Sequence, residues 1–265
     1  MPLYLDVGAI AMHALCYGHT KPTLLFLHGL GTNSTDWQPQ LSTFSPYYRV
    51  LAPDLPGHGQ SEPLTSHRGI PEMTRAVSRW LLTQNCGPVI VIGLSLGALV
   101  GLELLLKHPH QVLHAILING TTDLRLTDPD VSRFFTQRIW FVRLFGVENM
   151  AKAAAPLLFP DPQLHAVRER FIQQLSLNSK AQYLRLLYSL QNWQASAELM
   201  QRNCVPVDIV SSELDYLSEA RRRRLFAPLS YSRFHTLPGL HHAAPAESPE
   251  CCNQLLQHLL YQALR

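Results

Sequence analysis

Four stretches of this chain are apolar from end to end, and each runs into a loop rich in glycine or proline. They lie within PTLLFLHG at 22–29, YYRVLAPDLPGHG at 47–59, GPVIVIGLSLG at 87–97 and LHAILINGTT at 113–122. A strand with one face in water alternates apolar and polar residues, so unbroken apolar runs indicate strands that are buried on both faces. The sequence therefore predicts a mainly parallel sheet that is covered on both sides.

Segments with a helical spacing of apolar residues lie between these runs. They cover residues 33–44, 70–85 and 96–109, and in the second of them Met73 and Val77 fall on one helix face. Strands and helices in regular alternation are typical of βαβ units with right-handed crossovers. We therefore expect a doubly wound α/β fold.

The alternation stops once, between residues 123 and 204. This stretch contains several helical patterns and no strand pattern. A structureless loop of about 80 residues would be exceptional in a compact domain, so we expect a helical cap over one edge of the sheet. The α/β pattern resumes at 205–212 and 232–237, and a last helix starts at Pro249.

Two more strands are expected at the N-terminus, where residues 3–7 and 10–17 have the pattern of a hairpin that turns at Gly8. With the six later strands they give an eight-stranded, mainly parallel sheet, and the cap is inserted after the sixth strand. The predicted units are a core of residues 1–122 and 205–265 and a cap of residues 123–204.

Composition argues against several classes of protein. Hydrophobic residues make up 46% of the 265 residues and charged residues 15%, which is too apolar for a disordered chain. The net charge of +3 does not indicate nucleic-acid binding, and the one basic run, Arg221 to Arg224, is interpreted as a solvated helix face. Neither a membrane span nor a signal peptide is predicted. The five scattered cysteines fit reduced thiols, so we expect a cytoplasmic protein. We expect it to be a monomer or a small homo-oligomer.

The motif with the clearest chemistry is GLSLG, from Gly93 to Gly97. It follows an apolar strand directly and precedes a helix directly, which is the context that a nucleophile elbow requires. The sharp turn lifts Ser95 off the strand end, and the glycines let strand and helix approach closely. The N–H groups at the start of the helix face any negative charge that develops there. Ser95 is therefore the candidate nucleophile.

A serine hydroxyl needs a base within reach, and the base needs an acid to orient it. In a sheet of this kind both should follow the serine in the chain, at the carboxyl ends of later strands. The candidate bases are His241 and His242, in the loop after the last expected strand. The candidate acids are Asp215, just past the preceding strand, with Asp123 and Glu213 as alternatives.

These features together resemble the α/β-hydrolase superfamily, in the branch with a helical cap, over essentially the whole chain. The motifs that carry the resemblance are FLHGLGTNSTDW at 26–37, APDLPGHGQS at 52–61, GLSLG at 93–97, SSELD at 211–215 and PGLHHAAPAESPE at 238–250. In the family they form the oxyanion loop, a D-x-x-G-x-G-x-S loop, the elbow, the acid loop and the histidine loop. Ser212 and Ala98 depart from the family pattern, because many relatives have glycine at these positions.

The histidine loop sets the register within the resemblance. Glu247 and Pro249 lie five and seven residues after His242, and Gly239 lies three residues before it. All three spacings match the family pattern with His242 as the base and His241 as the alternative. His241 then occupies a position that is usually glycine, and we expect it to hold the loop or to form a wall of the pocket.

The resemblance also implies the remaining parts of the machinery. The acid loop makes Asp215 the orienting acid. The N–H groups of Leu30 and Leu96 are expected to form the oxyanion hole. His28 and His58 are assigned to the packing of loops beside the site.

The cap is the source of specificity. We expect an apolar substrate pocket above Ser95, with Gly29, Trp140, Phe141 and His241 in its walls. The cap also carries six basic residues that could meet an acidic carrier protein, namely Arg133, Arg138, Arg143, Lys152, Arg168 and Arg170.

The sequence thus predicts a hydrolase that cleaves a carboxylic ester through an acyl-enzyme. No cofactor is expected, and no metal site, because adjacent histidines point apart and no H-E-x-x-H helix is present. The alternatives are a lactonase or C–C bond hydrolase with the same triad, a hydrolase of carrier-protein-linked acyl esters or thioesters, and a binding protein without catalysis. The expected partner is a small-molecule ester with an apolar acyl or aryl part, and neither nucleic acid nor a membrane.

Overall fold

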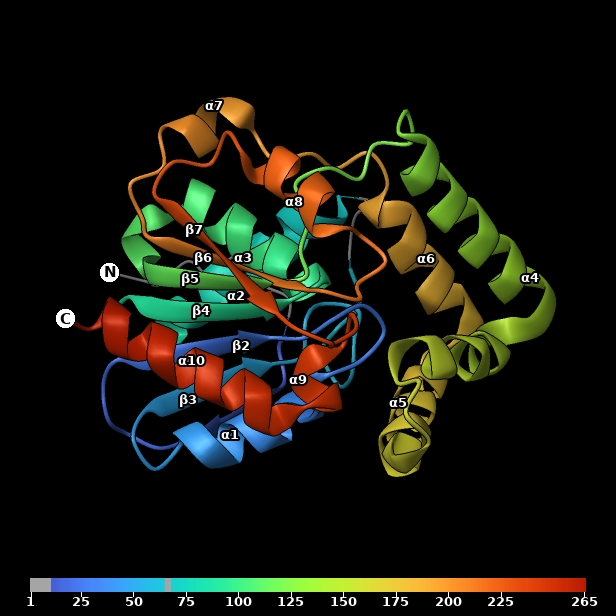
Figure 1. Ribbon diagram of the computed structural model, residues 1–265, viewed down its shortest axis with the longest axis horizontal. Helices are drawn as coiled ribbons and strands as arrows, with labels where there is room; N and C mark the ends of the chain where they lie inside the picture. The colour runs from blue at the N-terminus through green and yellow to red at the C-terminus, as the bar shows by residue number, and fades with distance from the viewer. Residues whose placement is uncertain (1–10, 65–67) are drawn as a thin grey trace, which may run out of the picture.

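In a computed structural model of the protein, residues 11–64 and 68–265 are described, and their centre is a seven-stranded sheet (Figure 1). The strand order is β1-β3-β2-β4-β5-β6-β7, and every neighbouring pair is parallel except β1 with β3. The strands are β1 (Ala14–Tyr17), β2 (Thr23–Leu27), β3 (Arg49–Pro53), β4 (Val89–Leu94), β5 (Val112–Ile118), β6 (Val207–Ser212) and β7 (Ser232–Leu237).

The predicted α/β fold with a mainly parallel sheet is confirmed, with a small difference in strand count. Eight strands were expected, and the described residues contain seven. The remaining expected strand, at 3–7, lies outside the described residues. The other arm of the expected hairpin, 10–17, contains β1, which forms the antiparallel edge of the sheet.

The sheet is buried on both faces, as its unbroken apolar runs predict. Every residue of β2 and β4 is buried. Because successive side chains of a strand point to opposite faces, neighbouring residues enter two different cores. Leu25 and Val91 belong to one core, while Leu24 and Ile90 belong to the other.

Helices cover both faces of the sheet (Figure 1). One face carries α1 (Gln38–Phe44) and α10 (Pro249–Ala263), which share a core with the central strands. The other face carries α2 (Gly69–Thr83), α3 (Leu96–Lys107) and α8 (Glu219–Phe226). The short elements η1 (Ser34–Trp37), η2 (Pro109–Gln111) and α9 (Ala244–Glu247) lie in the connections.

Between β5 and β6 the chain leaves the sheet and forms a group of helices at one end of the molecule (Figure 1). They are α4 (Pro129–Leu158), η3 (Pro162–Leu164), α5 (His165–Ser176) and α6 (Lys180–Leu190), here called the inserted helices, and α7 (Ala197–Gln201) follows them. A residue with φ of 82° and ψ of 173°, Gly146, interrupts α4. The several helical patterns expected between residues 123 and 204 correspond to these helices. No helix among the described residues has the length and apolar character needed to cross a membrane.

Candidate active site

Ser95 sits at a strained turn between β4 and α3. Its backbone has φ of 51° and ψ of −114°, in a region that residues with side chains rarely adopt. A Cβ atom at Gly93 would lie 2.4 Å from the carbonyl oxygen of Gly97, and one at Gly97 would lie 2.0 Å from the carbonyl oxygen of Leu27. Only glycine therefore fits on either side of the serine. The turn is a nucleophile elbow in geometry as well as in sequence.

His242 and Asp215 lie against each other beside this turn. His242 Nδ1 is 2.9 Å from Asp215 Oδ1, and the Asp215 side chain has no exposed surface. Asn119, at the end of β5, donates from Nδ2 to the carbonyl oxygen of His242 at 2.8 Å and to Ser212 Oγ at 2.8 Å. The ends of β5 and β6 and the histidine loop are thereby held together.

The alternative acids have partners other than His242. Asp123 forms an ion pair with Arg125, with Oδ2 and Nη2 2.6 Å apart. Glu213 accepts a hydrogen bond from the backbone N–H of Gly239 at 2.8 Å. Of the three candidate acids, Asp215 is the one that contacts His242.

Asp215 has a second buried partner, which the sequence interpretation missed. Arg222, on α8, is completely buried and forms an ion pair with Asp215. Its Nε also donates to the carbonyl oxygen of Gly120 at 2.9 Å. Burial alone would raise the pKa of Asp215, but His242 and Arg222 outweigh it and hold that pKa below its ordinary value. The carboxyl group is therefore a stable anion beside the imidazole.

The basic run is consequently not a simple solvated face. Arg221 forms ion pairs with Asp128 and Asp130, at the start of α4. Arg223 lies exposed beside Glu219 at 2.7 Å, while Arg222 points inward. Four consecutive helical residues cover the whole circumference, so at least one of them had to face the protein.

Tyr216 is the other functional neighbour that the sequence did not single out. Its hydroxyl lies 3.0 Å from His242 Nε2, and its ring centroid is 4.3 Å from that of His242. Tyr216 as a whole is 67% exposed, but its hydroxyl faces the serine and the imidazole. Desolvation of that hydroxyl and the adjacent Asp215 raise the pKa of Tyr216, whereas Arg138 and a hydrogen bond with the Ser95 side chain lower it by less. Tyr216 therefore stays a neutral phenol that joins the serine to the imidazole. Its only sequence signal was its place directly after the candidate acid.

The candidate oxyanion donors border the serine. Leu30 lines both cavities that reach Ser95. A Cβ atom on Gly29 would lie 4.0 Å from that of Ser95, so the loop after β2 passes close to the nucleophile. Leu96 is the first residue of α3, where the N–H group has no acceptor within its own helix.

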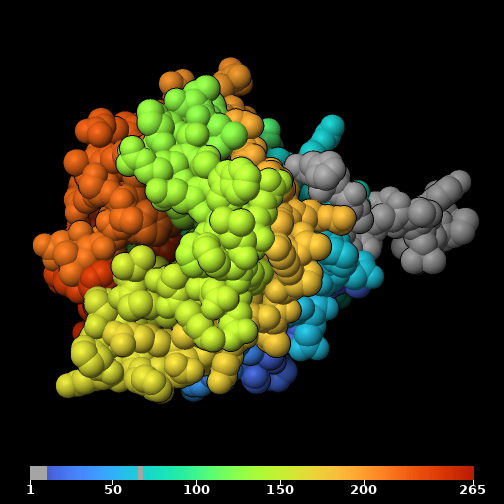
Figure 2. Space-filling model, turned by 90° about the vertical axis from the view of Figure 1, so that its right-hand side faces the viewer, coloured from blue at the N-terminus to red at the C-terminus, as the bar shows by residue number. Residues whose placement is uncertain are grey.

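Two cavities meet at Ser95, beneath the inserted helices. The first, of about 520 Å³, extends past Asn119 and Leu124 toward α8. The second, of about 590 Å³, contains His242 and extends past Phe159 and Phe171 beneath α4 and α5. Ser95 and Tyr216 line both cavities. Figure 2 shows a hollow on this side, between the green-to-yellow surface of the inserted helices and the orange surface that contains α8.

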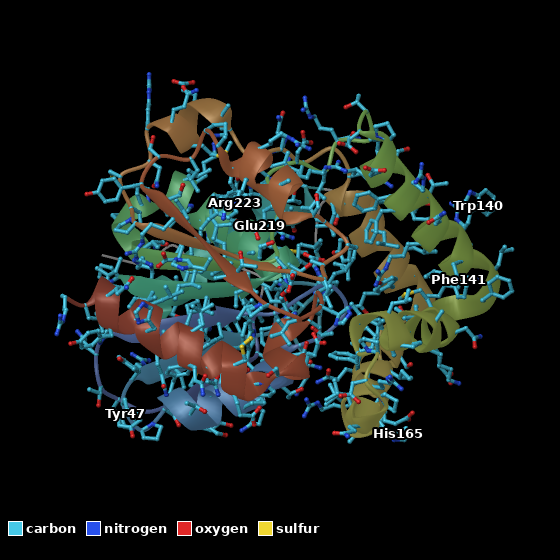
Figure 3. The ribbon with its side chains drawn as sticks, in the orientation of Figure 1. Tyr47, Trp140, Phe141, His165, Glu219 and Arg223 are labelled. Atoms are coloured by element: carbon cyan, nitrogen blue, oxygen red, sulfur yellow. The ribbon has the colours of Figure 1, made fainter. Side chains whose placement is uncertain are left out.

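Of the four residues predicted as pocket walls, Gly29 lines the second cavity, and the other three line neither cavity beside Ser95. Trp140 is 55% exposed and lies on the outer side of α4 (Figure 3). Phe141 packs on Phe145, with ring centroids 5.0 Å apart. His241 turns toward Glu247, whose Oε1 is 2.7 Å from its Nδ1. The inner face of α4 instead presents residues such as Phe134, Gln137 and Arg138.

His28 and His58 form a buried pair beneath the oxyanion loop. Their ring centroids are 5.1 Å apart, and both side chains are inaccessible. His28 Nε2 accepts the backbone N–H of Leu55 at 2.9 Å, so its proton is on Nδ1, which donates to the carbonyl oxygen of Gly29 at 2.8 Å. Burial lowers the pKa of His28 to about 4 and that of His58 to about 3. These neutral rings hold loops together, in keeping with the packing role that the resemblance implied.

Among the described residues no group of three or more histidine, cysteine, aspartate or glutamate side chains is placed to hold a metal ion. The groups around Ser95 can perform nucleophilic and acid–base chemistry by themselves. A strained serine, an imidazole on a buried carboxylate and two backbone N–H groups are the parts that acyl transfer requires.

Comparisons with known proteins agree with this geometry. The model of the alpha/beta hydrolase family matches residues 24–250. The chain is 29% identical over 260 residues to a putative carbamate hydrolase, RutD, of Agrobacterium fabrum. The matched region covers 94% of this chain and 98% of that protein.

Solved structures give the same result for the fold. The enol-lactonase from Burkholderia xenovorans LB400 superimposes with a TM-score of 0.86 at 21% identity, over 98% of this chain and all of its own. A thermophilic esterase from Thermogutta terrifontis has a TM-score of 0.82 at 20% identity, over 98% of this chain and 96% of that one. The chain therefore belongs to the alpha/beta hydrolase family, and it is a hydrolytic enzyme.

Proposed function

We propose that this hydrolase cleaves a carboxylic ester through an acyl-enzyme on Ser95, with His242 as the base and Asp215 as the orienting acid. The observation that carries the proposal is the 2.9 Å contact between His242 Nδ1 and the buried Asp215 carboxylate, beside a serine held at an elbow. A carboxylate only accepts hydrogen bonds, so the Nδ1 proton points to Asp215 and the Nε2 lone pair points toward the serine side.

The reaction begins when the Ser95 hydroxyl attacks the ester carbonyl carbon and its proton passes to His242 Nε2. The Tyr216 hydroxyl, 3.0 Å from Nε2, gives that proton a hydrogen-bonded path. The N–H groups of Leu30 and Leu96 stabilise the negative oxygen of the tetrahedral intermediate. His242 then protonates the departing alcohol, and water, activated by the same imidazole, releases the acid and restores Ser95.

The cavities support an ester with substituents on both sides of the carbonyl. Each cavity reaches Ser95, so the acyl part can occupy one and the alcohol part the other. We further propose that residues 123–204 serve as the cap, because the inserted helices supply much of the wall of both cavities. Residues 1–122 and 205–265 then form the catalytic core.

A carbamate or a lactone is the second candidate substrate. It is favoured by the names of two similar proteins, a putative carbamate hydrolase and an enol-lactonase. In a carbamate and in a lactone alike, the carbonyl carbon is bonded to an oxygen or nitrogen that can leave. The same serine, imidazole and oxyanion donors can therefore cleave either substrate.

The carrier-protein alternative gains no support from the basic residues of the inserted helices. Lys152 pairs with Glu148 at 2.6 Å and Arg133 with Asp130 at 3.9 Å. Arg138 lines the second cavity rather than the outer surface. The positive charges therefore do not form one outward patch.

A panel of p-nitrophenyl esters of increasing acyl length tests the proposal, with an aryl carbamate and a lactone alongside. We expect ester turnover by the intact protein and a fall in kcat of at least about 10⁴-fold in Ser95→Ala. Ser42→Ala, which changes an exposed serine of α1, should behave like the unaltered protein. Turnover that survives in Ser95→Ala would rule out the mechanism. A carbamate or lactone cleaved much faster than every ester would favour the second candidate.

A further inference from the structure

One arginine of the inserted helices faces the active-site cavity instead of an acidic partner. Arg138, on α4, lines the cavity of about 590 Å³ that also contains Ser95 and His242. The residues described, 11–64 and 68–265, place no carboxylate within 4.0 Å of its guanidinium group. A cation beside a partly apolar cavity usually has a counterion. Because the described residues supply no such counterion to Arg138, we expect the ligand to supply it.

The guanidinium group of Arg138 is held in place. Its Nε donates to the Tyr183 hydroxyl at 2.7 Å, and Tyr183 is completely buried. Its Cζ lies 5.5 Å from the ring centroid of Phe134 and 5.6 Å from that of Tyr183. The two terminal nitrogens make no hydrogen bond to another described residue. They form the end of the planar fork that binds a carboxylate through two parallel hydrogen bonds.

Arg138 is also coupled to the reactive centre through stacked rings. Phe134, on which it lies, stacks on Tyr216 with ring centroids 6.3 Å apart and an angle of 20°. Tyr216 in turn contacts His242. Because Arg138 and Ser95 line the same cavity, a group bound on Arg138 would share that cavity with the scissile carbonyl.

The rest of this cavity does not cancel the charge. Its other charged side chains are Arg170, on α5, and Asp36. Burial raises the pKa of Asp36 to about 6, although Thr32 and Arg170 oppose that rise. The cavity thus carries two arginines and one carboxyl group, so its side chains favour an anion even when Asp36 is ionised.

We propose that Arg138 is the carboxylate-binding subsite of this enzyme, so that the substrate carries a carboxylate in the part that occupies the second cavity. The inference rests on the proposed ester hydrolysis for its kinetic test. One guanidinium fork matches one planar carboxylate in charge and shape, and the apolar walls around Phe159 and Phe171 suit the carbon chain that links it to the ester.

The kinetic test compares esters that differ only in a terminal charge. Mono-p-nitrophenyl esters of succinate, glutarate and adipate are paired with their terminal methyl esters, and 4-carboxyphenyl acetate is paired with its methyl ester for the alcohol side. We expect the intact enzyme to show at least about ten-fold higher kcat/KM for the anionic member of one pair. In Arg138→Gln that preference should fall by about 10- to 100-fold, and Arg138→Lys should retain part of it.

Arg143→Gln is the matched control. Arg143 lies on the same helix and over two aromatic rings, those of Trp140 and Tyr188, but it lines neither cavity beside Ser95. This substitution should leave the charge preference unchanged. Equal losses for charged and neutral esters in Arg138→Gln, or no preference in the intact enzyme on either side, would overturn the subsite.

A binding experiment separates failure of the subsite from failure of the proposed function. Glutarate is titrated calorimetrically into the Ser95→Ala protein, with and without Arg138→Gln, after circular dichroism has verified the fold of each variant. Binding that is lost with Arg138 supports the subsite even if no ester is cleaved. No glutarate binding, together with turnover of neutral esters, would contradict the subsite and leave the ester hydrolase standing.

Discussion

At the scale of single residues, two adjacent histidines have different carboxylate partners. His242 Nδ1 contacts Asp215, after β6, whereas His241 Nδ1 contacts Glu247, in α9. Glu247 also accepts the backbone N–H of His241 at 2.6 Å. The two rings point apart, and His241 ties the loop to the helix that follows it. Glu247 thus fixes the loop from which His242 projects.

We predict that the two alanine substitutions separate catalysis from support. His242→Ala should lower kcat by about 10⁴-fold, because the serine loses its base. His241→Ala should lower the free energy of unfolding by about 1 to 3 kcal/mol, because Glu247 loses a charge-assisted partner, and should lower kcat by less than about ten-fold. Ester kinetics and urea unfolding of both variants check this. Collapse of kcat in His241→Ala alone would mean that the base has been assigned one residue too late.

At the scale of secondary-structure elements, α8 connects the acid to the inserted helices. Arg222 and Phe226 are one turn apart on this helix and both are buried, so they share its inner face. Arg221 reaches the acidic start of α4. A single short helix therefore holds the charge of Asp215 on one side and the first turn of α4 on the other.

We predict that Arg222→Met weakens both stability and catalysis. Removing one partner of a buried ion pair should cost about 3 kcal/mol of unfolding free energy. Without the arginine the Asp215 charge acts on His242 alone and stabilises the protonated imidazole, so the acid limb of the kcat/KM profile should move to higher pH. Arg223→Met, at the exposed neighbour beside Glu219 (Figure 3), should cost less than about 1 kcal/mol and leave the profile in place. An unshifted acid limb in Arg222→Met would leave Arg222 a purely structural role.

The elements were predictable where the information is local. Unbroken apolar runs identified β2 to β5, and the elbow needed only GLSLG between a strand and a helix. The inner face of α4 was not predictable, because the helix carries aromatic residues on several of its faces. Only tertiary packing decides that Phe134 faces the cavity and Trp140 faces outward. Arg222 was missed for the same reason, since a charge run reveals its buried member only when its partner is known.

At the scale of the whole molecule, the site lies between the carboxyl edge of the sheet and the inserted helices. Residues of α4, α5 and α6 supply much of the wall of the two cavities, and both cavities reach the serine that the sequence identified. Their position follows from the general rule for open α/β sheets. The charges that line the cavities do not follow from this rule, because Arg138 and Asp36 come from segments far apart in the chain. The substrate class therefore depends on packing that no single motif encodes.

The same packing gives the molecule a predictable response to acid. In the unfolded chain histidines bind a proton below about pH 6.5, but the native His28 and His58 do so only at about pH 4 and about pH 3. Between these values the unfolded state binds more protons, so the free energy of unfolding falls as the pH falls. Asp36 acts in the opposite sense, because its native pKa of about 6 lies above its ordinary value and the native state takes up its proton first.

Two histidines outweigh one carboxyl group, so we predict a net loss of stability between pH 7 and pH 5. Each histidine should contribute a loss of about 2 kcal/mol and Asp36 a gain of about 1 kcal/mol. Urea unfolding at pH 7, 6 and 5 measures the net change. In His58→Leu the loss should shrink by about 2 kcal/mol, because leucine takes up no proton in either state. The matched control is His165→Leu, at an exposed histidine of α5 (Figure 3), which should keep the full loss. If the His58→Leu protein lost as much stability as the unaltered one, the native His58 would have to take up its proton as readily as an unfolded histidine, which would contradict a neutral His58 enclosed beside His28.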